Sequence, residues 1–468
     1  MRLIKNTKQH RMINPVIIAY DRMRIFSALL KALKVREKEL PGEVLNNFLE
    51  KLYQKRETFL KSTNDLGTPQ YFYDKKNLLT QITLFHEAFI KNLPRFRSFY
   101  AVKSNSFLGI INDVVASGMG LDTSSGRELS MALETGCKKI LFSGPGKTDE
   151  ELILALKNRK RVVLLLDSFN ELRRLSSLIK RESVAKDVIE VGIRVHASDK
   201  DPWNKFGISI NDLPVIMEKA IRVKGISPCG IQFHSSWNLD PSRQISMIDE
   251  ISSFLSKYLS KYLLGNLRFL DIGGGFWPEH GEWLNPQNTL IGKLAQQLGV
   301  EYHFRAKHYY YPSNPIDKFA KNIANALLTQ PSPISDLEIF MEPGRWISNS
   351  SMHILLKVID QKSKDTFITD GGINLIGWER PMNEFIPVIN LTHFSKRELS
   401  TRIYGPLCTP DDIWGYSVFG NKIEIGDILL VPDQGAYTYS LRQSFIKPIS
   451  RVVGYNGSSI KELDGEYW

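Results

Sequence analysis

The sequence has few cysteines and no long apolar run. Its three cysteines, Cys137, Cys229 and Cys408, lie far apart, without the spacing of a disulfide framework or of a zinc site. We therefore expect free thiols in a reducing compartment. No apolar segment approaches the roughly 18 residues that a membrane helix needs, and the basic first 20 residues contain no continuous apolar core before a small-residue cleavage site. These absences predict a soluble, cytoplasmic protein.

The charge is unevenly distributed along the 468 residues. With 42% hydrophobic and 24% charged residues, the composition is that of a globular protein with two domains and an appendage. Residues 1–62 carry 14 Lys and Arg against 6 Asp and Glu, so 14 − 6 = +8 of the net charge of +11 lies there. Val44, Phe48 and Leu52 have helical spacing and predict amphipathic helices in a basic extension over residues 1–65. A solvated helical face explains this charge better than an acidic partner, and no nucleic-acid-binding motif accompanies it.

From Gly67 onward, short apolar runs alternate with helical patterns. A turn signal at Gly67-Thr68-Pro69 precedes a short strand pattern at 70–74. Eight further runs follow at 99–102, 120–121, 140–142, 162–166, 191–195, 231–233, 269–272 and 339–341. Eight strands alternating with helices predict an α/β fold, a (β/α)8 (TIM) barrel over residues 66–345. After Arg345 the pattern is β, with expected strands at 354–359, 366–369, 385–390, 423–431 and 446–453.

Polar or glycine-rich residues follow every one of the eight runs, where barrel enzymes place their active sites. In order they are Lys103, Asp122-Thr123-Ser124-Ser125, Ser143-Gly144-Pro145-Gly146, Asp167-Ser168, Arg194, His234-Ser235-Ser236, Gly273-Gly274-Gly275 and Glu342-Pro343-Gly344-Arg345. Each alone has an ordinary explanation: a strand-end lysine usually reaches solvent, and a triple glycine is usually a turn. Burial of Lys103 would lower its pKa and favour a nucleophilic amine. The full set predicts one active site.

These groups suit a phosphorylated, ring-shaped cofactor. Backbone N–H groups of Gly273, Gly274 and Gly275 can close on an anion, and Arg345 adds a cation beside them. Lys103 can form an imine, Glu342 can pair with a protonated ring nitrogen, and His234 can lie against a ring face. The cofactor that uses all of these groups is pyridoxal 5′-phosphate.

The sequence resembles the barrel-type (fold type III) pyridoxal-phosphate decarboxylases, the family of diaminopimelate and ornithine decarboxylases, from Gly67 to Pro448. The matching motifs, in the family's order, are 100–105, 120–129, 205–207, 270–276, 342–345, 405–408 and 435–437. The resemblance implies a C-terminal β-barrel domain over 346–468, joined by the strand near 70–74, and a homodimer with shared active sites. It implies cofactor contacts from Lys103, Asp122, Arg194, His234, Ser236, Gly273, Gly274, Gly275, Glu342, Gly344, Arg345 and Tyr437. Which serine after His234 reaches the phosphate stays open.

The resemblance also implies the reaction. A lone cysteine is more often buried and inert than catalytic, but Cys408 stands in Gly405-Pro406-Leu407-Cys408, and in relatives the matching cysteine helps to control protonation after carbon dioxide leaves. Glu342 favours a protonated ring and therefore decarboxylation, whereas the racemase relatives have an arginine there. Lys103, Cys408, His234 and Glu342 are the expected catalytic residues. Their retention disfavours a catalytically inactive regulatory homologue.

Departures from the family pattern bear on the substrate. The residue after the cysteine is acidic in the diaminopimelate and ornithine enzymes and helps to recognise the distal amine, but here it is Thr409. Asp411 or Asp412 could still supply that carboxylate. Asp370 lies in a segment like that of diaminopimelate decarboxylases, although the pair Arg380-Pro381 is displaced. We expect Cys408, Asp411, Asp412, Asp370 and Arg380 at the substrate.

Two segments point to a less common substrate. Cys408-Thr409-Pro410, together with Gly144-Pro145-Gly146-Lys147-Thr148, resembles family members of siderophore and other secondary pathways. We therefore expect a modified, conjugated or carrier-bound diamino acid, because an ammonium buried opposite Thr409 without a counter-charge costs several kcal/mol. A free diamino acid is the alternative.

Overall fold

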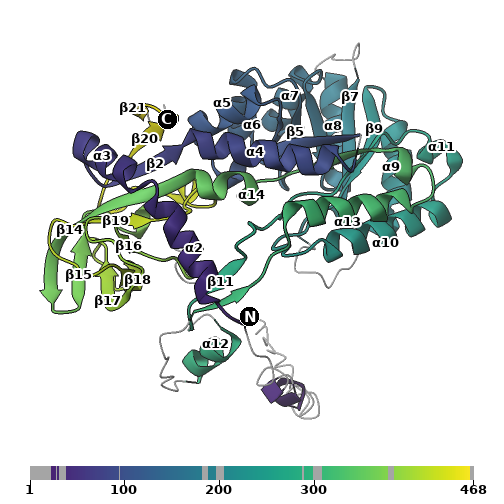
Figure 1. Ribbon diagram of the computed structural model, residues 1–468. Helices are drawn as coiled ribbons and strands as arrows, with labels where there is room; N and C mark the ends of the chain where they lie inside the picture. The colour runs from purple at the N-terminus through teal and green to yellow at the C-terminus, as the bar shows by residue number, and fades with distance from the viewer. Residues whose placement is uncertain are drawn as a thin grey trace, which may run out of the picture.

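The computed structural model describes residues 23–27, 29–30, 38–93, 95–181, 188–196, 205–286, 289–298, 308–377 and 384–463. They form a barrel domain and a second, β-rich domain, with a short N-terminal helical region packed beside them (Figure 1). No helix among the described residues is long and apolar enough to cross a membrane.

Eight parallel strands close into the barrel, which confirms the predicted fold. All eight apolar runs of the sequence are strands: β3 (Phe96–Ala101), β4 (Gly120–Thr123), β5 (Ile140–Phe142), β6 (Val162–Leu166), β7 (Ile189–His196), β9 (Ile226–Gln232), β10 (Phe269–Asp271) and β13 (Glu338–Met341). Their order is β6-β5-β4-β3-β13-β10-β9-β7, and pairing of β6 with β7 closes the ring. A short strand, β8 (Ile208–Ser209), extends the edge of β7.

Helices cover the outside of the barrel (Figure 1). They are α4 (Lys75–Ile90), α5 (Leu108–Ala116), α6 (Gly126–Glu134), α7 (Asp149–Lys157), α8 (Phe169–Arg181), α9 (Leu213–Ile221), α10 (Ser242–Tyr258), α11 (Lys261–Leu264) and α13 (Ile316–Leu328). Local sequence fixes several starts: Thr148 and Glu151 form a capping box on α7, and the side chain of Asp74 accepts a hydrogen bond from the N–H of Asn77 to cap α4.

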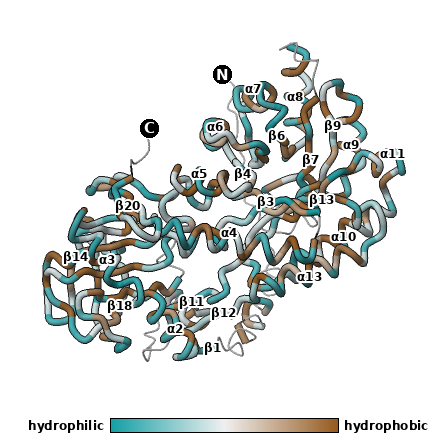
Figure 2. The backbone as a smooth tube through the Cα atoms, turned by 45° about the horizontal axis from the view of Figure 1, so that its top comes forward, coloured by the Kyte–Doolittle hydropathy of each residue, from teal (hydrophilic) through white to brown (hydrophobic). Residues whose placement is uncertain are grey.

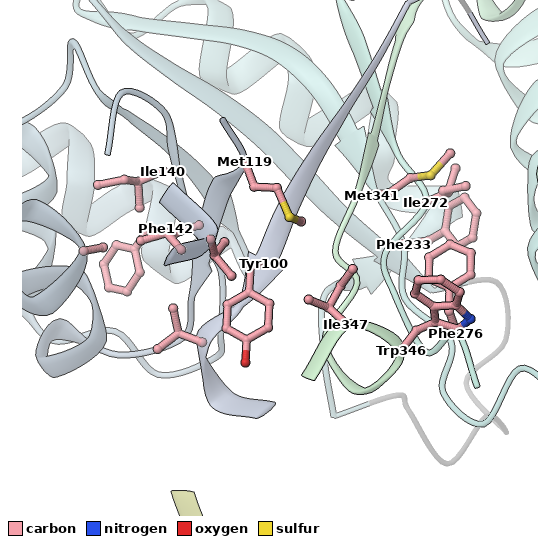
Figure 3. Close-up of a cluster of buried hydrophobic side chains, with 14 of the residues drawn as sticks. Tyr100, Met119, Ile140, Phe142, Phe233, Ile272, Phe276, Met341, Trp346 and Ile347 are labelled. Carbon is pink, nitrogen blue, oxygen red and sulfur yellow. The ribbon is translucent and has the colours of Figure 1, made fainter. Parts of the chain in front are cut away.

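Buried side chains fill the space inside and outside the strands. Inside the barrel, the rings of Phe269 and Phe340 stack with centroids 4.3 Å apart. Gly230 makes room for them, because a Cβ there would lie 2.0 Å from the ring of Phe269. Figure 3 shows part of the main core, with Tyr100 of β3 apart from a second group of side chains that includes Phe276 and Trp346. This close packing holds the strand ends in place.

The second domain is one nine-stranded sheet. Its strands are β14 (Met352–Ser363), β15 (Thr366–Thr369), β16 (Ile389–Asn390), β17 (Glu398–Tyr404), β18 (Ile413–Phe419), β19 (Ile428–Val431), β20 (Arg451–Tyr455), β21 (Ile460–Leu463) and β2 (Gln70–Asp74). β2 lies between β14 and β20. Strands β17, β18 and β21 were not predicted; in β17 and β21 the apolar residues are few and broken by polar ones, as in Glu398–Tyr404.

The N-terminal region packs on both domains. Helices α2 (Gly42–Tyr53) and α3 (Arg56–Leu66) bury Leu49, Leu52 and Phe59 against the β-rich domain. β1 (Lys38–Glu39) pairs with β12 (Tyr309–Tyr311), which pairs with β11 (Glu282–Leu284). Figure 2 shows these strands grouped beside α2. β11, α12 (Leu290–Gln297) and β12 all belong to the connection between β10 and α13. Residues 1–22, which hold much of the basic charge, lie outside the described residues.

Candidate active site

A cavity of about 840 Å³ opens at the carboxyl ends of the barrel strands. One side, which we call the barrel wall, consists of strand-end residues: Lys103, Ser124, Ser143, Arg194, His234, Ser236, Gly275, Glu342, Gly344 and Arg345. A second part of the lining, which we call the cap wall, consists of residues of the β10–α13 connection: Trp277, Glu282, Leu284, Leu290, Lys293 and Tyr311. Glu384, Tyr437 and Leu441 of the β-rich domain also line the cavity.

Lys103 is held by a buried carboxylate. It follows β3 in a short 3-10 turn, and its Nζ donates a hydrogen bond to Asp122 Oδ2 over 2.8 Å. Asp122 Oδ1 accepts from the hydroxyl of Ser143 over 2.6 Å. Burial lowers the pKa of Lys103, but the carboxylates of Asp122 and Glu342 outweigh it and raise this pKa above its ordinary value. The lowered pKa expected from burial alone is therefore wrong, because the strand pattern does not reveal the neighbouring carboxylates.

Glu342 and His234 form the second charged group of the barrel wall. His234 Nδ1 lies 3.2 Å from Glu342 Oε2, and Gln232 Nε2 donates to Glu342 Oε1 over 3.2 Å. Burial alone would raise the pKa of Glu342. The hydrogen bond from His234 and the charges of Lys103 and Arg194 have the larger effect and lower this pKa to about 2. Burial lowers the pKa of His234. The N–H of Gly274 donates to the same Nδ1 over 3.3 Å, and Nε2 lies 3.2 Å from Ser236 Oγ.

The triple glycine forms a tight loop after β10. Gly273 and Gly275 have φ of +67° and +76°, and a Cβ on Gly274 would lie 2.1 Å from the carbonyl oxygen of Glu342. Only glycine fits there. The Gly273 N–H donates to Asp271 Oδ1 over 2.9 Å.

Two buried polar residues were missed as site residues. Gln232 holds Glu342, and Asp271 holds the glycine loop. Burial and the charge of Glu342 raise the pKa of Asp271 well above its ordinary value. Each stands in an otherwise apolar run, Ile231-Gln232-Phe233 and Leu270-Asp271-Ile272, and that interruption was the available signal.

Arg345 is already paired with an acidic residue. Its Nη1 lies 3.2 Å from Glu384 Oε1, and its guanidinium lies 4.5 Å from the ring centroid of Trp277 and 5.2 Å from that of Tyr437. The Tyr437 N–H donates to the carbonyl of Ser104 over 2.7 Å, which ties the β-rich domain to the segment of Lys103. The sequence located Arg345 and Tyr437 at the site but gave no sign of Glu384.

Arg194 and Ser236 are two further residues of the barrel wall. The guanidinium of Arg194 lies 4.6 Å from the ring centroid of Phe206, and the next residue, Gly207, donates its N–H to Asp167 Oδ1 over 2.9 Å. Of the two serines after His234, Ser236 lines the cavity, whereas Ser235 Oγ donates to Asn238 Oδ1.

The expected substrate residues do not line the cavity of this chain. Cys408 is exposed, and Asp411 is exposed beside it. Asp412 is buried, and its two oxygens accept from the N–H groups of Ile373 and Leu407 over 2.8 and 2.7 Å. Asp370 accepts from the hydroxyl of Thr68 and the N–H of Lys357. Arg380 lies outside the described residues.

Within the described ranges, no group of three or more His, Cys, Asp or Glu side chains is placed to hold a metal ion.

Comparisons with known proteins agree with this geometry. Residues 79–349, more than half of the chain, match the family model of the pyridoxal-dependent decarboxylases, pyridoxal binding domain. Diaminopimelate decarboxylase of Bacteroides thetaiotaomicron is 26% identical over 385 residues, covering 80% of this chain and 91% of the relative. That of Campylobacter jejuni is 28% identical over 398 residues, covering 81% and 89%.

Solved structures share the fold. Diaminopimelate decarboxylase from Helicobacter pylori, complexed with L-lysine, superposes with a TM-score of 0.67 at 24% identity, over 84% of this chain and 93% of that one. The lysine/ornithine decarboxylase of Vibrio vulnificus, complexed with putrescine, gives 0.67 at 21% identity, over 86% and 98%. The chain belongs to the pyridoxal-dependent decarboxylase family and is a pyridoxal-phosphate-dependent amino-acid decarboxylase.

Proposed function

We propose that this enzyme removes the α-carboxylate of a free diamino acid. One observation carries the choice of substrate: relatives named diaminopimelate decarboxylases match about four fifths of this chain and most of their own length. This reverses the preference for a conjugated substrate that the Thr409 motif suggested.

The cavity fits the cofactor. Its volume of about 840 Å³ lies within the range of small-molecule sites. Gly275 of the glycine loop borders the cavity, and a Cβ there would lie 2.3 Å from the carbonyl oxygen of Ser235, so only bare backbone fits. The N–H groups of Gly273 and Gly274 already donate to Asp271 Oδ1 and His234 Nδ1, so a phosphate would meet this loop at Gly275. Ser236, Gly344 and Tyr437 border the same space and would contribute to binding.

Each charged group of the barrel wall then has a task. When bound, pyridoxal phosphate accepts the electron pair that the departing carboxylate leaves behind. Lys103 would attach the cofactor covalently, and Asp122 would orient its Nζ before attachment. Glu342, ionised because of its low pKa, would pair with the ring nitrogen, and neutral His234 would lie against the ring. Arg194 would add positive charge at the carboxyl end of β7.

We further propose a homodimer in which Cys408 of one copy completes the cavity of the other. Support comes from the exposure of Cys408 and from its place outside its own cavity lining. The thiol would then supply a proton to the carbon that has lost its carboxylate. Mixing inactive Lys103→Ala with inactive Cys408→Ala tests this arrangement, because mixed dimers would regain one intact site. Activity that stays absent in a mixture shown to exchange subunits contradicts it.

A second candidate is a diamino acid whose distal amine is acylated or joined to a larger group, as in siderophore pathways. The observation in its favour is Thr409, which offers no carboxylate where related diamino-acid enzymes have one. A carrier-bound form would need a docking surface, and the basic charge of residues 1–62 is the available candidate.

Carbon dioxide release across free and acylated diamino acids decides between them. We expect kcat/KM for diaminopimelate, lysine or ornithine to exceed that of the matching Nω-acyl compounds by tenfold or more. A tenfold preference for an acylated compound would overturn the proposal in favour of the second candidate.

A further inference from the structure

Asp271 is a buried carboxyl group that has no task in the chemistry described above. It is the last residue of β10 and is fully buried. Its Oδ1 accepts a hydrogen bond from the Gly273 N–H over 2.9 Å. Its Oδ2 is also buried, and no N–H or O–H group of the described residues donates to it. An ionised Asp271 would therefore keep one charged oxygen in the protein interior without a donor, which is costly.

The charges around Asp271 also disfavour its ionised form. Burial and the negative charges of Glu342 and Asp122 raise the pKa of Asp271 well above its ordinary value, and a backbone hydrogen bond offsets them only in part. Lys103 is bonded to Asp122, and Lys103 and Arg194 both act on Glu342. An ionised Asp271 would add a third carboxylate to this group of two carboxylates and two cations.

The carboxyl groups of Asp271 and Glu342 also meet directly. A hydrogen bond between the two side chains is one of the causes that raise the pKa of Asp271. Two carboxylates cannot form such a bond, because each can only accept, so one of the two carries a proton. Glu342 has a pKa of about 2 and accepts from Gln232 Nε2, whose Cα is paired with that of Asp271 across β9 and β10. Asp271 is the favoured carrier of the proton.

We propose that Asp271 is a neutral carboxylic acid whose Oδ2 proton is donated to Glu342, and that this bond positions Glu342 for the cofactor ring. Asp271 does not line the cavity and acts through Glu342, so it is a positioning residue. A hydrogen bond to an ionised carboxylate favours the ionised form, so the proton of Asp271 helps to keep Glu342 charged. The effect on turnover rests on the role proposed for Glu342, whereas the presence of the proton does not.

Infrared spectroscopy detects the proton directly. At neutral pH, the holoenzyme should show the C=O band of a protonated carboxyl group, and this band should be lost in Asp271→Asn. Asp167→Asn is the matched control, because Asp167 is also buried and accepts from the backbone N–H of Gly207. The control should keep the band. If Asp271→Asn loses no such band, Asp271 is ionised and the neutral acid is overturned.

Two substitutions separate a neutral acid from a working carboxylate. Asparagine resembles the protonated acid, because its amide oxygen can accept from Gly273 and its amide N–H can donate to Glu342. Leucine removes both hydrogen bonds at similar size. We expect Asp271→Asn to keep kcat within about threefold of the wild type and Asp271→Leu to lower kcat about tenfold or more. A loss in Asp271→Asn as large as that in Asp271→Leu would overturn the proposal. If Asp271→Leu does not fold, a tenfold loss of kcat in Asp271→Asn has the same meaning.

The pH dependence of stability gives a readout with a definite sign. A carboxyl group whose pKa is raised on folding lowers the free energy of unfolding as pH rises above its ordinary value, here 3.8. Asp271→Asn removes this contribution. The stability of Asp271→Asn relative to the wild type should therefore increase from pH 4 to neutral pH, as measured by denaturant unfolding. An ionised Asp271 with a lowered pKa would give the opposite slope and would contradict the proposal.

The outcomes for Asp271 and for the proposed function are distinguishable. If Glu342→Gln leaves turnover unchanged, the role proposed for Glu342 falls, and the infrared band and the stability slope still test the proton on Asp271. If Glu342→Gln lowers turnover but Asp271→Asn loses no carboxyl band, the proton on Asp271 is overturned and the proposed function stands.

Discussion

The two walls of the cavity hold their charges differently. On the barrel wall, Lys103 is paired with Asp122, and Glu342 with His234. On the cap wall, Glu282 and Lys293 line the same cavity without a side-chain partner among the described residues. The pKa values reflect the difference: that of Glu342 is lowered to about 2, and that of Glu282 is raised. A wall with internal partners is organised before a ligand arrives, whereas Glu282 feels the charges of Arg345 and Lys293 without a direct bond to either.

The largest expected effect is loss of Lys103. Lys103→Ala removes the amine that would attach the cofactor and leaves Asp122 buried without its cation. Decarboxylation should fall by about 10²- to 10⁴-fold, the range for a lost group that acts on the reacting atoms. Borohydride reduction followed by peptide mapping should place the cofactor label on the peptide of Lys103 in the wild type. A label on another lysine would refute the assignment of the barrel wall.

Glu342→Gln sharpens the comparison within the barrel wall. Glutamine keeps the size of the side chain but removes the charge that favours a protonated ring. We expect turnover to fall at least tenfold, about 1.4 kcal/mol in barrier height, while cofactor affinity survives because the glycine loop is intact. Single-turnover kinetics and a cofactor titration measure the two quantities. Unchanged turnover would exclude the role proposed for Glu342.

The sequence predicts the residues of the barrel wall better than those of the cap wall, because regular strands position only the former. Every barrel-wall residue lies at or just after the carboxyl end of an apolar strand, and the topology brings those positions to one edge. Lys103, His234 and Glu342 could therefore be grouped from the amino-acid sequence alone. Their local environment could not: the pairing of Lys103 with Asp122 depends on distances between strands, and this reversed the expected direction of its pKa.

The sequence contains no such strand pattern for the cap wall. Glu282 and Lys293 lie in a connection whose short strands and helix follow no regular apolar run, and Glu384 belongs to a different domain. Charged residues in such segments are usually solvated, so nothing in the sequence distinguished these three from the other acidic and basic residues. Strand β17 was missed in the same way, because four of its seven residues are polar or charged.

The loop that carries Cys408 belongs to neither wall. Substitution of Asp412 tests how much the hydrogen bonds of this residue stabilise the loop. Asp412→Asn leaves one of the two N–H groups, of Ile373 or Leu407, without its acceptor. The free energy of unfolding should fall by about 1–3 kcal/mol. Asp411→Asn is the matched control, because Asp411 is exposed and should change stability by no more than about 0.5 kcal/mol. Denaturant unfolding measures both. A larger effect from Asp411 would point to a ligand or partner contact there.

The smallest effect concerns Glu282 and pH. Its pKa is raised above the ordinary value of 4.5 in the folded protein, so the folded state binds this proton more tightly than the unfolded state does. The ionised side chain therefore destabilises the fold increasingly as pH rises through the raised pKa, and the effect vanishes below the ordinary value. Near neutral pH, Glu282→Gln should raise the free energy of unfolding by less than about 1 kcal/mol, given the partial exposure of the group.

The activity of Glu282→Gln should fall at neutral pH while its stability rises. The two measurements together test the role of the cap wall. In the wild type, kcat/KM for a diamino acid should decline on the acid side as Glu282 takes up its proton and loses its attraction for an ammonium. Glu342, with a pKa of about 2, stays ionised over that range. In Glu282→Gln this acid-side decline should flatten while kcat/KM at neutral pH is lower. Since a merely structural Glu282 would alter stability without reshaping the pH profile, an unchanged profile in a variant of raised stability would remove the functional difference between the two walls.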